Sequence, residues 1–137
     1  MRLTKPLLLL AMIFLFGNAN QLYAQHNNSP KIIAVFNHAD WCKGCQIMKP
    51  KLKAIKPQFK DRKVLFTGFE KTNKFTKYQS AMLAEQLGLS KLYQKYKGKT
   101  AFVVLIDAKT KEELGILTFK ESKEELKKAI VQALNTK

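Results

Sequence analysis

Trp41-Cys42-Lys43-Gly44-Cys45 holds both cysteines of the chain, with two residues between them. An apolar run, Ile32 to Phe36, comes before this stretch, and residues with helical spacing follow it. A C-x-x-C motif at a strand-to-helix junction is typical of a dithiol/disulfide redox site. The motif therefore predicts a strand-to-helix junction that carries a dithiol/disulfide redox site.

The two cysteines have different expected roles. Cys42 would lie at the helix N-terminus, where unpaired backbone N–H groups and the helix dipole favour a thiolate. Lys43 adds a positive charge that acts in the same direction. We therefore expect Cys42 to be the nucleophile. Cys45, one helical turn further on, would be the resolving thiol that closes the disulfide and releases a mixed-disulfide partner.

Two other interpretations of the cysteine pair stay open. A static disulfide would close a very small loop and constrain little of the unfolded chain. A zinc site needs four ligands, and the only histidines in the chain are His26 and His38. A thiophilic ion such as Cu(I) would need His38 or a second subunit beside the cysteines. No set of residues is therefore assigned as a metal site.

Length and composition indicate one globular domain. The chain has 137 residues, of which 46% are hydrophobic and 26% charged, as in ordinary folded proteins. The formal net charge is +15, and the lysines are scattered along the chain, which indicates a solvated surface. Acidic partners or an anionic membrane surface are the binding alternatives that this charge leaves open. The chain lacks a basic stripe with interleaved aromatic residues, so we expect no nucleic-acid partner.

The N-terminus has the pattern of a secretory signal peptide. Arg2 and Lys5 form a positive region, and the apolar run 7–16 is too short for a comfortable membrane span. Small and polar residues follow up to Ala24, which offers a cleavage site before Gln25. We expect residues 1–24 to be a signal peptide, residues 25–30 a flexible lead-in and residues 31–137 the domain, with no membrane span in the mature chain. An uncleaved N-terminal anchor is the alternative.

The domain should alternate strands and helices. Apolar runs with β-branched residues predict strands at 31–37, 63–69, 100–106 and 113–119, and helical spacing predicts helices at 41–59, 76–96 with a break at 88–90, and 122–134. Asp40 is the expected N-cap of the first helix, and Pro50 should kink it. The apolar faces expected on the three helices are Ile47, Met48, Leu52, Ile55 and Phe59; Met82, Leu83, Leu87, Leu92, Tyr93 and Tyr96; and Leu126, Ile130 and Leu134.

This order resembles the thioredoxin superfamily. The resemblance rests on Ala39-Asp40-Trp41-Cys42-Lys43-Gly44-Cys45 and on Pro50, five residues after the second cysteine. It implies an α/β fold of minimal thioredoxin-like type, a four-stranded mixed sheet in the order strand, helix, strand, helix, strand, strand, helix. The first strand–helix unit of the family is missing. The resemblance also implies that Trp41 covers the site, that Pro50 is the helix-kinking proline, and that Cys42 and Cys45 exchange disulfides without a bound organic cofactor.

Three positions depart from the family pattern. Thr100 stands where the family has a cis-proline, so the backbone there should be trans. Phe36 replaces the buried acid six residues before the first cysteine, so proton transfer would need His38, Asp40, Glu70 or water. Phe119 stands where the family has a glycine in the substrate groove, which should make the groove more apolar or more crowded.

The sequence thus predicts a thiol–disulfide oxidoreductase exported to the periplasm of a Gram-negative bacterium. Its partners would be protein thiols and disulfides, some of them acidic proteins, with an upstream protein as electron donor. The residues Lys43-Gly44 between the cysteines favour a moderately reducing potential. A metal-handling protein and a non-catalytic binding module with the same fold are the alternatives.

Overall fold

A computed structural model describes residues 28–136, and the predicted signal peptide lies outside this range. The helices and strands are β1 (Ile32–His38), α2 (Lys43–Ile55), a 3₁₀ helix η1 (Lys56–Phe59), β2 (Val64–Glu70), α3 (Lys74–Gln86), α4 (Ser90–Lys95), β3 (Phe102–Asp107), β4 (Glu113–Thr118) and α5 (Lys123–Asn135). The predicted order of strands and helices is confirmed. Gly88, with a φ of 70°, ends α3 at the predicted break.

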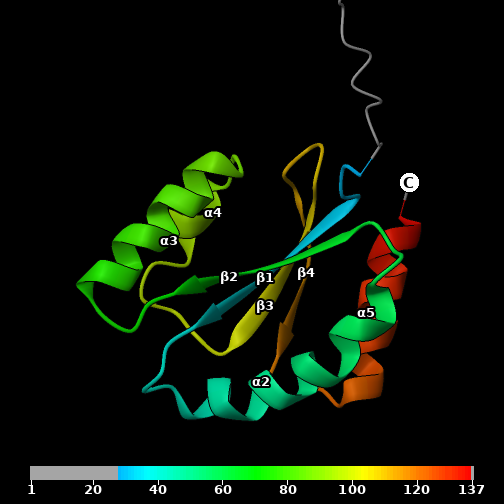
Figure 1. Cartoon of the computed structure of the whole chain (residues 1–137), viewed down its shortest axis with the longest axis horizontal. Helices are drawn as coiled ribbons and strands as arrows, with labels where there is room; N and C mark the ends of the chain where they lie inside the picture. Colours follow the sequence, from blue (N-terminus) through cyan, green and yellow to red (C-terminus); the bar gives the residue numbers. More distant parts are fainter. Residues whose placement is uncertain (1–27, 137) are drawn as a thin grey trace, which may run out of the picture.

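The four strands form one mixed sheet in the order β2-β1-β3-β4. β1 pairs with β2 in parallel, and the β1–β3 and β3–β4 pairs are antiparallel. Figure 1 shows α2 and α5 on one face of this sheet and α3 and α4 on the other. The predicted four-stranded mixed sheet with flanking helices is therefore confirmed.

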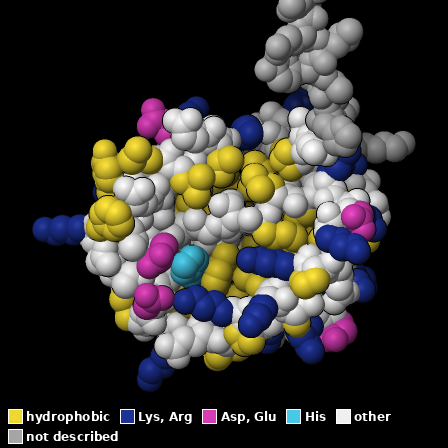
Figure 2. Space-filling view, viewed as in Figure 1, with side chains coloured by type: hydrophobic (Ala, Val, Ile, Leu, Met, Phe, Trp, Pro, Cys, Tyr) yellow, Lys and Arg dark blue, Asp and Glu magenta, His cyan; other side chains and the backbone are white. Residues whose placement is uncertain are grey.

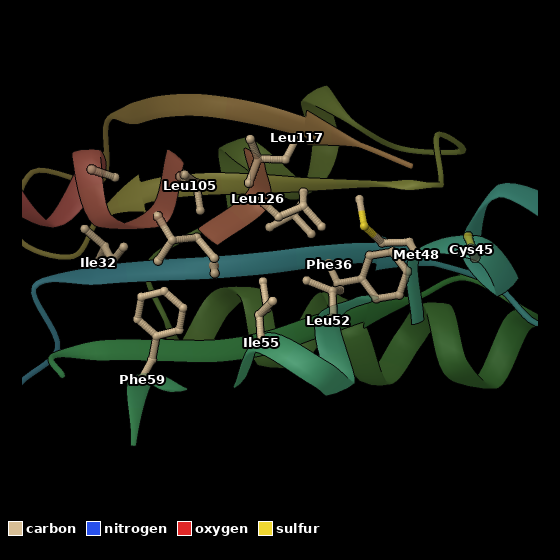
Figure 3. Packing of buried hydrophobic residues seen from close by; sticks show 14 of the residues in the cluster. Ile32, Phe36, Cys45, Met48, Leu52, Ile55, Phe59, Leu105, Leu117 and Leu126 are labelled. Atoms are coloured by element: carbon tan, nitrogen blue, oxygen red, sulfur yellow. The ribbon is translucent and has the colours of Figure 1, made fainter. Parts of the chain in front are cut away.

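The first five residues of β1 are all apolar, which suits a strand whose sheet has helices on both faces. Ile32, Ala34 and Phe36 point into the cluster beneath α2 and α5 (Figure 3). Ile33 and Val35 point into a second cluster beneath α3 and α4. None of the helices found between residues 28 and 136 is long and apolar enough to cross a bilayer.

Several helical predictions were wrong in detail. α2 begins at Lys43 rather than Trp41, and it ends at Ile55, where η1 continues the chain to Phe59. Ile47 was expected in the buried face of α2 but is 48% exposed, whereas its neighbour Met48 is fully buried. Met82 and Leu83, two of the predicted apolar positions of this region, are exposed, because α3 contacts the core through smaller side chains.

A buried lysine joins the sheet to the segment before β3. Lys71 is 2% exposed, and its ammonium donates hydrogen bonds to Asn37 Oδ1 (2.9 Å), the Tyr96 carbonyl (2.6 Å) and the Lys99 carbonyl (2.9 Å). The protonated amine has three donors for these three acceptors. Burial lowers the pKa of Lys71 to about 8. The side chain fixes the Tyr96–Lys99 turn against the end of β1.

We predict that Lys71→Met lowers the free energy of unfolding at pH 7 by at least about 2 kcal/mol, because three buried acceptors lose their donor. The pKa of Lys71 is lower in the folded chain than its unfolded value of about 10.4, so the unfolded chain binds more protons between these values. The free energy of unfolding of the wild type should therefore rise, relative to Lys71→Met, as the pH increases from about 8 to about 10.4. Urea titrations across this range measure both effects.

Lys91→Met provides the control, because Lys91 is an exposed lysine of α4. Its stability should follow the wild-type pH profile. Parallel profiles for the wild type and Lys71→Met would show that the Lys71 pKa is not lowered by folding.

Candidate active site

The two cysteines form a disulfide at the start of α2. Cys42 and Cys45 are joined, with their Cα atoms 5.2 Å apart. Cys45 is completely buried, whereas Cys42 is 7% exposed. An incoming sulfur atom therefore has access to Cys42 and none to Cys45.

Backbone groups at the helix N-terminus surround Cys42. Cys42 itself is the N-cap of α2, and its Sγ accepts a hydrogen bond from the Cys45 N–H at 3.1 Å. The prediction that Asp40 is the N-cap was wrong. Its carboxylate instead pairs with Lys49 at 3.2 Å. In most N-caps a side-chain oxygen accepts this hydrogen bond, whereas here the Cys42 sulfur accepts it. A hydrogen bond from a backbone N–H favours the thiolate form of Cys42 once the disulfide is reduced.

The residues that flank the cysteines differ in exposure. Trp41 is 61% exposed, and its indole N–H donates to the Thr72 carbonyl at 3.2 Å. Lys43 is exposed as well. Pro50 lies inside α2, which continues for five more residues after it. Trp41 thus lies beside the disulfide as a solvent-facing apolar surface rather than as a buried packing residue.

Gly44 marks the closest approach between α2 and the rest of the site. A Cβ at this position would lie 2.7 Å from the Ala101 Cβ and 2.8 Å from Cδ1 of Phe119. Ala101 has a φ of 72°, a backbone conformation that residues other than glycine rarely adopt. The segment before β3 and the Phe119 ring therefore pack directly on the residue between the two cysteines.

A groove opens beside this contact. It has a volume of about 340 Å³, and its lining includes Tyr96, Thr100, Ala101, Ile116 and Phe119. Every peptide bond of the described chain is trans, including those at Thr100, as the sequence predicted. The Ala101 N–H donates to the Asn37 carbonyl at 2.9 Å, which ties this segment to the end of β1.

The surroundings of the buried cysteine are apolar. Figure 3 shows Cys45 next to Met48 and the Phe36 ring, at one end of the cluster beneath α2. His38 stacks on Phe36 with ring centroids 4.9 Å apart, and its buried Nδ1 has no hydrogen-bond partner among the described residues. Burial is the main cause that lowers the pKa of His38, so its ring is neutral at pH 7.

The other candidate proton carriers make bonds away from the cysteines. The Glu70 carboxylate accepts from the Thr72 hydroxyl at 2.8 Å, and Asp40 pairs with Lys49. Within residues 28–136, no group of three or more His, Cys, Asp or Glu side chains is arranged to hold a metal ion.

The comparisons with known proteins concern the fold. No family model and no curated protein matches the sequence. A thiol:disulfide interchange protein of the thioredoxin family from Chlorobium tepidum is similar in structure, with a TM-score of 0.55 and 18% identity over 80% of this chain and 83% of that chain.

Two further solved structures are similar. DsbF of MTB, in mixed oxidized and reduced forms, has a TM-score of 0.53 and 14% identity over 78% of this chain and 84% of its own. StoA of Bacillus subtilis has a TM-score of 0.51 and 13% identity over 74% of this chain and 84% of its own. The protein therefore has a thioredoxin fold. In this chain, Gly44 between the two disulfide-bonded cysteines packs against Ala101 and Phe119.

Sequence reasoning missed two residues near the site. Ala101 has no signal in the sequence, since an alanine after a polar turn gives no indication of a positive φ. Lys71 resembles the many exposed lysines around it, and only the folded chain shows that its ammonium is surrounded by three acceptors. Both residues act on the segment that packs on Gly44.

We predict that Gly44→Ala lowers the free energy of unfolding by about 1–3 kcal/mol, because the new methyl group would overlap Ala101 and Phe119. Alanine in an open helical position would instead stabilise by up to about 1 kcal/mol. Adding Ala101→Gly should recover part of the loss, since it removes one overlapping atom and suits the positive φ. Urea denaturation of the single and double variants measures the coupling.

Gly115→Ala is the matched control, because nothing lies within 4 Å of a Cβ placed there. It should change the stability little. Additive effects of Gly44→Ala and Ala101→Gly would contradict the proposed contact.

Proposed function

We propose that this protein is an exported thiol–disulfide oxidoreductase that exchanges its Cys42–Cys45 pair with the thiols and disulfides of partner proteins. The proposal rests mainly on one observation. The disulfide caps the N-terminus of α2 in a thioredoxin fold, with Cys42 7% exposed and Cys45 completely buried.

The difference in exposure supports the following order of the two steps. In the reduced protein, the Cys42 thiolate attacks a sulfur of the partner's disulfide, and the other partner sulfur leaves as a thiolate. Cys45, as a thiolate, then attacks Cys42 Sγ and releases the partner's second thiolate. Two electrons pass from the dithiol to the partner, and Cys42 and Cys45 end as the disulfide.

The wider features of the proposal come from the sequence. The signal-peptide pattern of residues 1–24 supports export to the periplasm of a Gram-negative bacterium, where disulfides persist. The net charge of +15 supports acidic partners. Similar solved proteins are described as thiol:disulfide interchange proteins, which supports the reaction class. The pair Lys43-Gly44 supports a role as reductant or electron carrier supplied by an upstream protein.

We predict that Cys42→Ser abolishes reduction of insulin disulfides by dithiothreitol through this protein, because the accessible nucleophile is lost. Cys45→Ser should retain the nucleophile but lose the resolving step, so it should accumulate mixed disulfides that are visible on non-reducing gels. The two variants are matched, because both lack the disulfide and only one lacks the attacking sulfur. Full activity of both variants would rule out the mechanism.

The direction of electron flow is tested by the reduction potential of the Cys42–Cys45 pair. We predict a value below about −200 mV, in the range of reductants and electron carriers. Equilibration of the mature protein with glutathione and dithiothreitol buffers measures it. A value near about −120 mV would instead place the protein among strong oxidants.

A further inference from the structure

The helix α3 shows an unusual distribution of its side chains. Its two buried residues are the small Ser80 and Ala84. Its large apolar residues face solvent, with exposed fractions of 69% for Phe75, 63% for Tyr78, 47% for Met82 and 37% for Leu83. These four residues, which we call the outer face of α3, recur at helical spacing and form one side of the helix.

The outer face is not needed to hold α3 in place. The Ser80 hydroxyl donates to the Glu70 carbonyl at 2.8 Å, and the Tyr93 hydroxyl donates to the Lys77 carbonyl at 2.8 Å. Buried Ala84 packs in the cluster above the sheet. These contacts anchor the helix. Phe75 and Leu83 border a hollow beside Gly68 and Glu70 of β2, whereas Tyr78 and Met82 are not part of that hollow and are exposed. An exposed apolar surface of this kind marks an interaction site.

The outer face of α3 starts close to Trp41, which is next to Cys42 in the sequence. The Asp40 N–H donates to the Thr72 hydroxyl at 3.0 Å, and the Trp41 indole donates to the Thr72 carbonyl at 3.2 Å. Asn73 then caps α3, so Phe75 lies in the first turn after this contact. In Figure 1 the starts of α2 and α3 lie at the same end of the molecule, and Figure 2 shows apolar side chains exposed over α3.

The charges around this surface favour an acidic partner. Lys43, Lys74 and Lys77 are exposed, and none of them forms an ion pair with a carboxylate of residues 28–136. A second copy of the chain would bring the same lysines together and be repelled, at a net charge of +15 per copy. The carboxylates of Asp40 and Glu70 lie at the same edge, and Asp40 pairs with Lys49. These three lysines still leave an excess of positive charge, which suits a negatively charged protein.

We propose that Trp41 and the outer face of α3 form one docking surface for the partner protein that exchanges disulfides with Cys42. The partner contributes an apolar segment flanked by acidic side chains. This inference rests on the proposed function and extends it, because it places affinity for the partner on α3 and leaves the chemistry at Cys42. A small disulfide, which reaches only Cys42, should not need the outer face.

The first experiment identifies the partner at two positions at once. The Cys45→Ser variant carries the photo-cross-linker benzoylphenylalanine in place of Tyr78 and is mixed with an extract of the cells that make this protein. One protein should be attached both to Cys42, by a reducible disulfide, and to position 78, after irradiation. A disulfide-linked protein that never cross-links to position 78 would overturn the docking surface while leaving the proposed function intact.

The second experiment uses that purified partner. The triple variant Phe75→Gln/Tyr78→Gln/Met82→Gln keeps helix-forming residues and removes the apolar surface. It should exchange disulfides with the partner at least about tenfold more slowly than the wild type, as expected for the loss of interface anchors. Its rate with glutathione disulfide should change less than twofold. Lys74→Glu/Lys77→Glu should also slow the partner reaction, and salt should slow it in the wild type.

Leu65→Thr is the control, because Leu65 is an exposed apolar residue at the opposite end of β2 from Glu70. It should react with the partner at the wild-type rate. Unchanged partner kinetics in the triple variant would overturn the inference. So would a cross-link between two copies of the chain, or binding to phosphatidylglycerol vesicles that is lost in the triple variant. A wild type that exchanges with neither glutathione disulfide nor insulin would instead refute the proposed function, and the inference with it.

Discussion

The contact of Gly44 with Ala101 and Phe119 is the constraint on which the rest of the site depends. A Cβ at position 44 would lie 2.7 Å from that of Ala101, so glycine alone lets α2 begin this close to the segment before β3. On either side of this contact, Cys45 is completely buried and Cys42 is 7% exposed. The proposed order of attack rests on this small difference between the two cysteines.

The segment before β3, which contacts Gly44 through Ala101, is fixed by hydrogen bonds to the end of β1 and to Lys71. The Ala101 N–H bonds to the Asn37 carbonyl, and Lys71 bonds both to the Asn37 side chain and to the carbonyls of Tyr96 and Lys99. A buried ammonium is costly unless each proton finds an acceptor, and here the end of β1 and the turn before β3 supply all three. A polar network thus holds the segment before β3 at its base.

The groove beside Ala101 and the outer face of α3 are both apolar. Phe119 and Ala101 line an apolar groove on one side of the disulfide, and Trp41 leads to the outer face of α3 on the other side. The two surfaces flank the start of α2, and both lysines and carboxylates lie around them. A partner that approached Cys42 would remove apolar area from water in either direction, whereas a small thiol would contact neither surface fully. In the proposed function, this arrangement would separate the chemistry of the sulfur atoms from the selection of partners.

The sequence by itself determined the order of strands and helices, the disulfide motif at the start of α2 and the trans backbone at Thr100, because each depends on local pattern or on residue type. Only the tertiary structure decided which side chains are covered. Ile47 and Met82 have the spacing of buried residues, yet α2 and α3 turn Met48, Ser80 and Ala84 toward the sheet instead. Lys71 is buried, yet in the sequence it looks like the exposed lysines of the chain. Helical periodicity gives the position of a residue around its own axis, whereas burial depends on which side of that axis the rest of the chain occupies.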